Sequence, residues 1–280
     1  MRNSLIYVNG TFTEQPTIDV EERGFQFGDG IYEVVAVKAG RLLFTRDHFN
    51  RLENSCAALR IQHGFTYQTF EKAMNELVEK THCENGMVYI QVTRGTASRN
   101  HAFPSPTTVG CCYAYTMSNA SSAHALQEGK AITLADIRWL RCDIKSLNLL
   151  GSVLAKQEAS ESGADEAILH REGIVTEGSS TNVFVVNDGI LYTHPANHLI
   201  LNGITRQYVI KLAKEAGHQV VEEPFSIQFL EQADEVFITS TTQRIRPITT
   251  LNAKKLTDAP GSLTSKLQQA LQATILNELN

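Results

Sequence analysis

Apolar residues recur at helical spacing in two early segments of the chain, and each segment predicts an amphipathic helix. The apolar faces consist of Phe49, Leu52, Cys56 and Leu59 in the first helix, which Thr45 can cap, and of Phe70, Met74, Leu77 and Val78 in the second. Apolar runs also flank two turn pairs, Asn9-Gly10 and Ala39-Gly40, and predict two hairpins. Residues 87–93 and 108–116 predict buried strands. The N-terminal part is therefore expected to mix helices and strands.

The small, polar segment 118–123 is the best linker candidate in the chain. Beyond it, short strands are predicted at residues 131–135, 166–170, 182–186, 190–193, 219–222 and 235–239, with helices at 149–162, 205–216, 226–232 and 262–279. The length of 280 residues is close to twice the ~150 residues of a typical domain. We expect an α+β protein with a small N-terminal domain (1–117) and a larger, β-rich domain with helices (124–280).

Composition and charge narrow the class of protein. Apolar residues make up 42% and charged residues 20%, as in ordinary soluble globular proteins. The net charge of −5 argues against a dedicated partner among nucleic acids or anionic membranes. No apolar run approaches the ~20 residues of a membrane span, and the N-terminus lacks the apolar core of a signal peptide. The five cysteines, an odd number without a CxxC pair, predict reduced thiols in a cytoplasmic protein and no metal site.

Two segments have the chemistry of an anion site. Gly203-Ile204-Thr205-Arg206 opens a predicted helix, where free N–H groups and the helix dipole favour a negative charge. Ser240-Thr241-Thr242 ends an apolar strand with three hydroxyl groups. The alternatives, an ordinary helix start and an ordinary turn, stay open, and together the two segments indicate a phosphate-bearing ligand only weakly.

Other candidates have equally simple alternatives. Lys145 is a candidate nucleophile if its setting lowers its pKa, but most lysines are solvated. Glu177 stands before a turn-forming run, and Arg99 and His101 form a cationic pair suited to a carboxylate or merely to a solvated loop. For Arg51, surface exposure is expected. The chain has no nucleotide-binding, metalloprotease or serine-hydrolase motif, so the residues alone lead no further.

At these same positions the sequence resembles the fold-type IV pyridoxal-phosphate enzymes, and within them the D-amino acid aminotransferases of the D-alanine type. The resemblance runs through most of the chain and is strongest at residues 23–35, 92–104, 136–159, 166–184, 188–206 and 236–242. Six such segments in this order are specific. The resemblance implies a two-domain fold with pyridoxal 5'-phosphate between the domains, and a homodimer.

The resemblance also implies roles for individual residues. Lys145 aligns with the Schiff-base lysine that moves a proton, and Glu177 aligns with the carboxylate at the pyridine nitrogen. The other cofactor contacts, most of them around the phosphate, are expected at Arg51, Ser180, Ile204, Thr205, Ser240 and Thr241. The substrate carboxylate is expected at Tyr32, Arg99 and His101, the last two reaching the site from the neighbouring subunit. The expected substrates are a D-amino acid and a 2-oxo acid such as 2-oxoglutarate or pyruvate.

One departure concerns the substrate. Relatives usually have an acidic residue where this chain has Arg244, and Arg246 follows two residues later. These cations favour a dicarboxylic substrate or are solvated surface charges. The alternative functions are those of a branched-chain L-amino acid aminotransferase or an aminodeoxychorismate lyase of the same fold, and, from another class, a scaffold without catalysis.

Overall fold

The computed structural model describes residues 2–118, 128–257 and 260–279, and it divides into two compact units. Unit 1 comprises residues 1–120, 144–148 and 278–280, and unit 2 comprises residues 121–143 and 149–277. The proposed linker at residues 118–123 lies outside the described residues, apart from Ser118 at the end of a strand.

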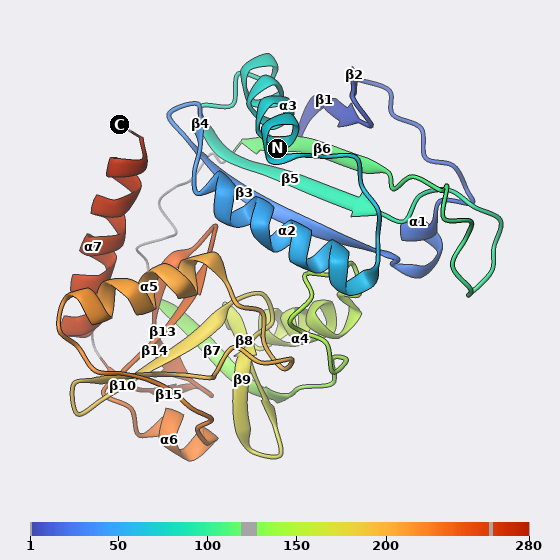
Figure 1. Ribbon diagram of the computed structural model, residues 1–280. Helices are drawn as coiled ribbons and strands as arrows, with labels where there is room; N and C mark the ends of the chain where they lie inside the picture. Colours follow the sequence, from blue (N-terminus) through green and yellow to red (C-terminus); the bar gives the residue numbers. More distant parts are fainter. Residues whose placement is uncertain (1, 119–127, 258–259, 280) are drawn as a thin grey trace. The chain divides into compact units, whose positions relative to one another are not determined.

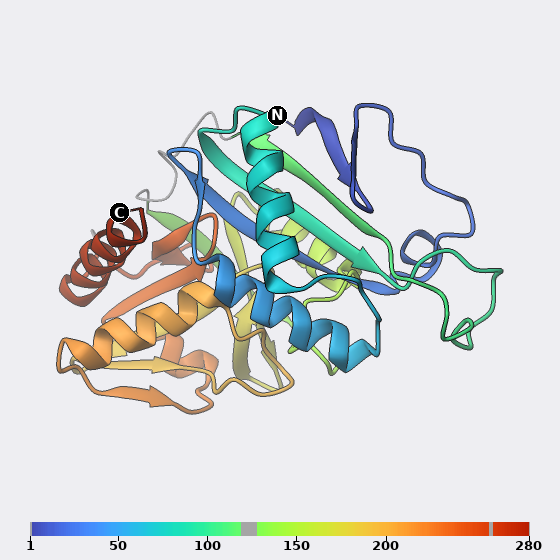
Figure 2. The same ribbon diagram turned by 45° about the horizontal axis from the view of Figure 1, so that its top comes forward.

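Unit 1 is built on a six-stranded antiparallel sheet with the strand order β2-β1-β6-β5-β3-β4. The elements are β1 (Arg2–Val8), β2 (Thr11–Thr13), α1 (Arg23–Phe27), β3 (Gly30–Lys38), β4 (Arg41–Leu42), α2 (Thr45–Leu59), α3 (Tyr67–Lys80), β5 (Asn85–Thr93) and β6 (Cys112–Ser118). The helices α2 and α3 lie on the same face of this sheet (Figure 1), and Figure 2 shows both from above.

The core of unit 1 forms between this sheet face and the two helices. It contains the predicted apolar faces of α2 and α3 together with alternate residues of β3 and β5, such as Val35 and Ile90, which are fully buried. The helical spacing in the sequence is therefore confirmed. Thr45 is the first residue of α2 rather than its cap, because Phe44 occupies the cap position without a side-chain hydrogen bond.

Unit 2 contains a nine-stranded mixed sheet with the order β12-β11-β10-β13-β14-β7-β8-β9, and β15 pairs with β14. The elements are β7 (Gly129–Ala135), α4 (Leu150–Glu161), β8 (Glu166–Arg171), β9 (Ile174–Gly178), β10 (Asn182–Asn187), β11 (Ile190–Thr193), α5 (Ile204–Glu215), β12 (Val220–Glu222), α6 (Ile227–Glu231), β13 (Glu235–Ser240), β14 (Arg244–Leu251), β15 (Lys254–Lys255) and α7 (Ser262–Glu278). Parallel pairs join β11 to β12, β14 to β7 and β7 to β8.

A short stretch of chain, residues 144–148, belongs to unit 1 although both of its neighbours along the chain belong to unit 2. It lies beside the start of β3, where Tyr32 N donates to Lys145 O (2.9 Å) and Leu147 N donates to Gly30 O (3.0 Å). A side chain at Gly30 would come within 2.8 Å of Leu147 Cδ1 and within 2.7 Å of the Val92 carbonyl on β5, so the close approach requires glycine. This pairing fixes the backbone of Lys145 next to Tyr32.

The described part of the chain contains no helix long and apolar enough to span a membrane. All five cysteines lie within the described residues and are free, as their number and spacing predict. The sequence pattern did not predict α1, β9, β14 or β15. The helix α1 has only five residues, one of them glycine, and β14 contains two arginines and a proline within its first half.

Candidate active site

Lys145 lies in a half-buried position in unit 1 and is held through its backbone. Its N–H donates to Ser55 Oγ of α2 (3.3 Å), and its carbonyl accepts from Tyr32 N. The Nζ atom lies 4.0 Å from the centroid of the Tyr32 ring, on the aromatic face. The structure therefore brings together two predicted site residues, Lys145 and Tyr32.

A buried ionic cluster lies between β3 and α2 and includes a third predicted residue, Arg51. Arg51 donates to both carboxylate oxygens of Glu33 through Nε (2.7 Å) and Nη2 (2.8 Å), and His48 Nδ1 is 2.8 Å from the same carboxylate. Glu33 is fully buried, and the Arg51 side chain is only 12% exposed. The expected surface exposure of Arg51 is wrong because Glu33 points toward the helix side of the sheet and pairs with it. The Nη1 atom of Arg51 does not take part in this pair.

The charges of this cluster set its ionisation. Burial opposes ionisation of Glu33, but the charge and hydrogen bonds of Arg51, with His48, outweigh burial and hold the pKa of Glu33 well below its usual range. Burial also lowers the pKa of His48, against the pull of Glu33. The cluster therefore contains an ionised carboxylate and an ionised guanidinium beside a neutral imidazole at neutral pH.

Glu33→Gln is expected to lower the free energy of unfolding at pH 7 by about 3–5 kcal/mol, because it leaves the buried charge of Arg51 uncompensated. The pKa of Glu33 is lowered, so its stabilising effect is present above its ordinary pKa and is lost as the pH falls through the lowered one. Urea unfolding of Glu33→Gln and of Glu76→Gln, which breaks the exposed pair with Lys80, tests this. Equal losses of unfolding free energy in the two variants would show that the buried pair stabilises the fold no more than the exposed pair does.

Arg99 and His101 lie on an exposed loop between β5 and β6, in unit 1. Arg99 Nη1 donates to Gln26 Oε1 (3.3 Å), and its guanidinium lies 4.5 Å from the centroid of the Phe27 ring. The His101 ring packs against the same phenylalanine, with 5.5 Å between centroids. The two predicted cations are thus neighbours on one aromatic ring, and both remain accessible.

Glu177 is the next-to-last residue of β9 in unit 2, and it is buried with both carboxylate oxygens hydrogen-bonded. Arg138 Nη1 donates to Oε1 (2.6 Å), while Asn182 Nδ2 and the backbone N–H of Leu201 donate to Oε2 (3.0 Å each). Asp136 holds Arg138 from the other side through Nε and Nη2. Burial raises the pKa of Glu177 to about 7, although the charge and hydrogen bond of Arg138 oppose this shift. Glu177 can therefore exchange a proton near neutral pH.

The turn after Glu177, which contains Ser180, is organised around a buried carboxylate that the sequence did not single out. Glu166 of β8 is fully buried and accepts from the backbone N–H of Ser179 (3.2 Å) and from the hydroxyls of Ser179 and Thr181 (3.0 Å for Thr181). The Ser180 hydroxyl lies at the limit of hydrogen bonding to the same carboxylate, at 3.5 Å. The run Gly178–Asn182 is therefore a fixed turn rather than a mobile loop.

The N-terminus of α5 fits an anion. Gly203 is the cap residue and offers no side-chain oxygen, and no acidic residue lies in the first turn, so the N–H groups at Ile204 and Thr205 are not capped by a side chain. A side chain at Gly203 would come within 2.2 Å of Asn182 Oδ1, the residue that also binds Glu177. This contact places the start of α5 beside the buried carboxylate.

Ser240 ends β13 and Thr241 follows it, which brings both to the same region of unit 2. In the sheet, Thr239 of β13 lies opposite Asn182 of β10. The Thr239 hydroxyl is buried and lacks a hydrogen-bond partner among the described residues. Unit 2 therefore gathers the predicted residues Glu177, Ser180, Ile204, Thr205, Ser240 and Thr241 around Asn182 and its neighbours. The α5 start and the hydroxyls of Ser240 and Thr241 suit a phosphate group.

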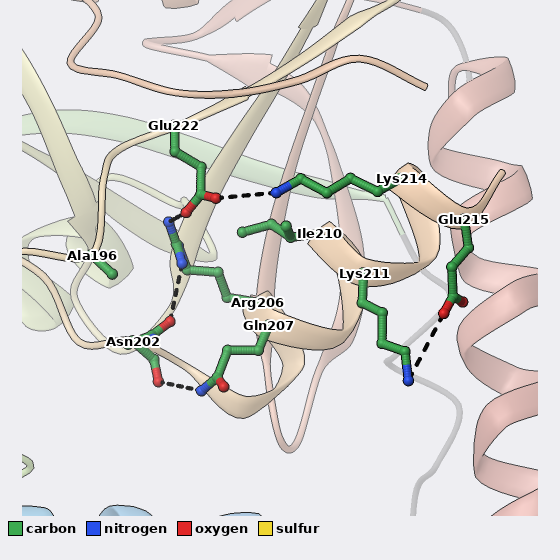
Figure 3. Close-up of a pocket in the computed structure, with 9 residues that line it drawn as sticks. All are labelled: Ala196, Asn202, Arg206, Gln207, Ile210, Lys211, Lys214, Glu215 and Glu222. Carbon is green, nitrogen blue, oxygen red and sulfur yellow. Dashed lines mark hydrogen bonds and ion pairs between the residues drawn. The ribbon is translucent and has the colours of Figure 1, made fainter. Parts of the chain in front are cut away.

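A pocket of about 460 Å³ is lined mainly by residues of α5, together with Ala196, Asn202 and Glu222 of β12 (Figure 3). Its charged side chains pair with one another: Arg206 and Lys214 with Glu222, and Lys211 with Glu215. Ile204 and Thr205 do not line it. Because each of these charged side chains already has a partner of opposite charge within the pocket, we do not assign the pocket to the cofactor.

Arg244 and Arg246 have partners within unit 2. Arg244 Nη1 donates to Gln272 Oε1 of α7 (2.6 Å), and Arg246 forms an ion pair with Asp165 (2.9 Å). Only 12% of the Arg246 side chain is exposed and Arg244 is partly buried, so neither is a fully solvated surface charge. A preference for dicarboxylic substrates stays a prediction.

The family model for class IV amino-transferases matches residues 30–251. The chain belongs to this family. A D-alanine aminotransferase from Bacillus licheniformis is 44% identical over 277 residues, which cover 98% of this aminotransferase and 98% of that protein. One from Staphylococcus epidermidis (strain ATCC 12228) is 43% identical over 274 residues, covering 96% and 97%. The expected enzyme class, an aminotransferase, is confirmed.

The solved structures that resemble this aminotransferase confirm the fold-type IV architecture. The branched-chain amino acid aminotransferase of Escherichia coli has a TM-score of 0.92 at 25% identity, covering 98% of this chain and 95% of that one. A second branched-chain amino acid aminotransferase, from T.th., was solved in complex with N-(5'-phosphopyridoxyl)-L-glutamate. It has a TM-score of 0.89 at 26% identity, covering 98% and 95%.

Four charged residues that contact candidate site residues or their partners were not singled out from the sequence. Glu33, Asp136 and Glu166 are buried acids, and Arg138, whose side chain is 10% exposed, pairs with both Asp136 and Glu177. The one available signal was a charged residue at a core position of a predicted strand, as for Glu33 in β3. Such a residue needs a buried partner.

Proposed function

We propose that this aminotransferase binds pyridoxal 5'-phosphate and transfers the amino group of a D-amino acid, typified by D-alanine, to a 2-oxo acid such as 2-oxoglutarate or pyruvate. The observation that carries the proposal is the position of Lys145. This half-buried amine has a fixed backbone and an aromatic neighbour, in a chain that matches D-alanine aminotransferases over nearly its full length.

The residues of unit 2 fit the cofactor. The phosphate would bind at the start of α5 and at the hydroxyls of Thr205, Ser240 and Thr241, because these groups offer hydrogen bonds without a competing negative charge. Arg51 adds a cation whose Nη1 remains outside the pair with Glu33. Glu177 would hold a proton on the ring nitrogen. When bound, the cofactor supplies an electron sink for the bond that breaks at the substrate Cα.

Lys145 is the group that moves the proton. A neutral amine close to the substrate can take the proton from Cα and return it to the cofactor side, which is general base followed by general acid catalysis. The fixed backbone at Lys145 and the ring of Tyr32 limit the directions that its Nζ can reach. This restriction determines which face of the substrate Cα loses its proton, and therefore favours one enantiomer.

Arg99 and His101 would bind the substrate carboxylate together with Tyr32. We infer that the enzyme is a homodimer in which these two residues serve the site of the neighbouring subunit. An exposed apolar patch on unit 2 supports a dimer: Ile137 and Leu140 are 68% and 59% exposed, and Leu150 is 72% exposed. The side chain of Arg138, which stands between Ile137 and Leu140 in the sequence, lies beside Gly151, so these two residues are close to Leu150. We place the enzyme in the cytoplasm on the basis of its free cysteines.

Arg99→Ala is expected to lower kcat/KM for D-alanine about 10- to 200-fold, mostly through KM, because a hydrogen bond to a charged group contributes about 1.5–3 kcal/mol. The visible absorbance of the bound cofactor should stay unchanged. Arg99→Lys keeps the positive charge but lacks the planar guanidinium, so its kcat/KM should lie between those of Arg99→Ala and the native enzyme. If steady-state kinetics of Arg99→Ala matched the native enzyme, the carboxylate role would have to be given up.

The substrate class is tested by coupled assays with 2-oxoglutarate as acceptor and D-alanine, D-glutamate or L-leucine as donor. We expect D-amino acids to be used and L-leucine to be poor. The solved structures give the alternative, since the two branched-chain aminotransferases share the fold at about a quarter identity. A clear preference for L-leucine would favour that alternative and contradict the proposal.

A further inference from the structure

The segment Gly24–Gly30, rich in glycine and aromatic residues, contains most of α1, which has no role in the proposed chemistry so far. Almost every residue of α1 with a long side chain contacts the loop that carries Arg99 and His101. Arg23 donates to the carbonyls of Asn100 (2.6 Å) and Ala102 (3.5 Å), and Gln26 accepts from Arg99. The helix is therefore attached to this loop along its length.

The helix α1 is itself held to unit 1 through Arg23, its one buried residue, and through the backbone around it. Arg23 is 3% exposed, and Asp29 accepts from its Nε and from Nε and Nη2 of Arg94 (2.8 Å each). Two further backbone bonds, Arg23 N to Gly95 O (3.0 Å) and Ala97 N to Glu21 O, tie the segment before α1 to the start of the loop. Gly24 leaves no space for a side chain, which would lie 2.4 Å from Thr93 Cγ2.

Phe27, the last residue of α1, is the common contact of the two cations. Its ring lies 4.5 Å from the Arg99 guanidinium and 5.5 Å from the His101 ring centroid. The Arg23 guanidinium lies 4.8 Å from the same ring centroid, so Phe27 also contacts the anchored arginine. A single aromatic ring thus contacts the side chains of both Arg99 and His101.

The chemistry of these contacts matters as much as their geometry. An aspartate or glutamate beside Arg99 would fix it equally well but would neutralise it and compete with a substrate carboxylate. An aromatic face and the Gln26 amide oxygen orient the guanidinium while leaving its full charge available. The contacts to Arg99 that the structure describes are of this neutral kind.

We propose that Phe27 is a positioning residue for substrate binding: it holds Arg99 and His101 as a preformed pair for the carboxylate of the amino acid. The inference rests on the proposed role of Arg99 and His101 and adds the element that aligns them. It predicts that the aromatic ring, rather than apolar bulk alone, is required at position 27.

The test compares Phe27→Leu with Phe25→Leu in the holoenzyme. Phe25 is on the same helix but 72% exposed, so its variant is a matched control. We expect Phe27→Leu to raise KM for D-alanine about 3- to 30-fold, the range of one cation–π contact, with kcat within about twofold. Phe27→Tyr should restore KM, and the cofactor absorbance should not change. Phe27→Met replaces the leucine variant if that protein does not fold.

A double-mutant cycle with Arg99→Ala separates positioning from a merely structural effect. If Phe27 acts through Arg99, Phe27→Leu should raise KM much less in the Arg99→Ala background than in the native one. The inference would be overturned if Phe27→Leu raised KM by the same factor in both backgrounds. It would also be overturned if Phe27→Leu and Phe27→Tyr had equal KM values. If Arg99→Ala raises KM and Phe27→Leu does not, only this inference fails. If Arg99→Ala has no effect, the proposed carboxylate site fails with it.

Discussion

Lys145→Ala is expected to lower the turnover of D-alanine by at least about 10³-fold, because the variant lacks the amine that we propose binds the cofactor and moves the proton. The fold should persist, since the backbone bonds of residue 145 to Ser55 and Tyr32 do not involve its side chain. Thermal unfolding and steady-state kinetics measure both effects. Lys211→Ala, which removes an exposed lysine on α5, serves as the control and should retain full activity.

The same assignment has a chemical test in the native enzyme. Borohydride treatment of the holoenzyme should attach the cofactor permanently to the amine that holds it, and peptide mapping should find it on Lys145. Cofactor attached to another lysine, or a Lys145→Ala variant with nearly native turnover, would contradict the assignment.

Glu177→Gln is expected to lower the turnover of D-alanine by at least about 10²-fold, as for the loss of one preorganised electrostatic contact in a buried site. The amide can still accept from Arg138 or Leu201, so it has nearly the same shape, but it carries no charge to hold a proton on the cofactor ring. The effect should therefore appear in kcat more than in KM. The cofactor should remain bound, because its phosphate contacts are separate.

The stability of Glu177→Gln separates this role from a structural one. Burial raises the pKa of Glu177 to about 7, so the native fold already tolerates the uncharged form of this side chain near neutral pH. The variant should melt within a few degrees of the native enzyme at pH 7. A large loss of stability together with lost activity would indicate that the pair with Arg138 is mainly structural. Unchanged turnover would exclude the electron-sink role.

The helices and strands that the sequence predicts well are those with long, regular patterns. The apolar spacing of Phe49 and Leu52, or of Phe70 and Met74, is read directly as helix because those faces form the core of unit 1. The apolar pattern does not predict the helix α1, because Arg23 and its contacts with a distant loop stabilise this helix rather than a periodic apolar face. The strand β14 is not predicted either, because Arg246 and Pro247 interrupt its apolar pattern.

The candidate site was only partly predictable from the sequence, because several of its contacts join residues that are distant along the chain. The anion-binding character of Gly203–Arg206 and Ser240–Thr242 follows from local chemistry. The roles of Lys145 and Glu177 came from resemblance, since spacing alone does not distinguish a reactive lysine from a solvated one. The pairing of Lys145 with Tyr32 spans more than a hundred residues and depends on the close approach at Gly30, which has no local signal.

Removal of the amino group from a D-amino acid through Lys145 is the central step of the proposed reaction. The most direct measurement mixes the yellow holoenzyme with D-alanine or with L-alanine in the absence of a 2-oxo acid and follows the visible absorbance through one half-reaction. D-Alanine should bleach the visible band rapidly and release pyruvate, and L-alanine should leave the band unchanged on the same timescale. Equal bleaching by both enantiomers, or bleaching by L-alanine alone, would contradict the account.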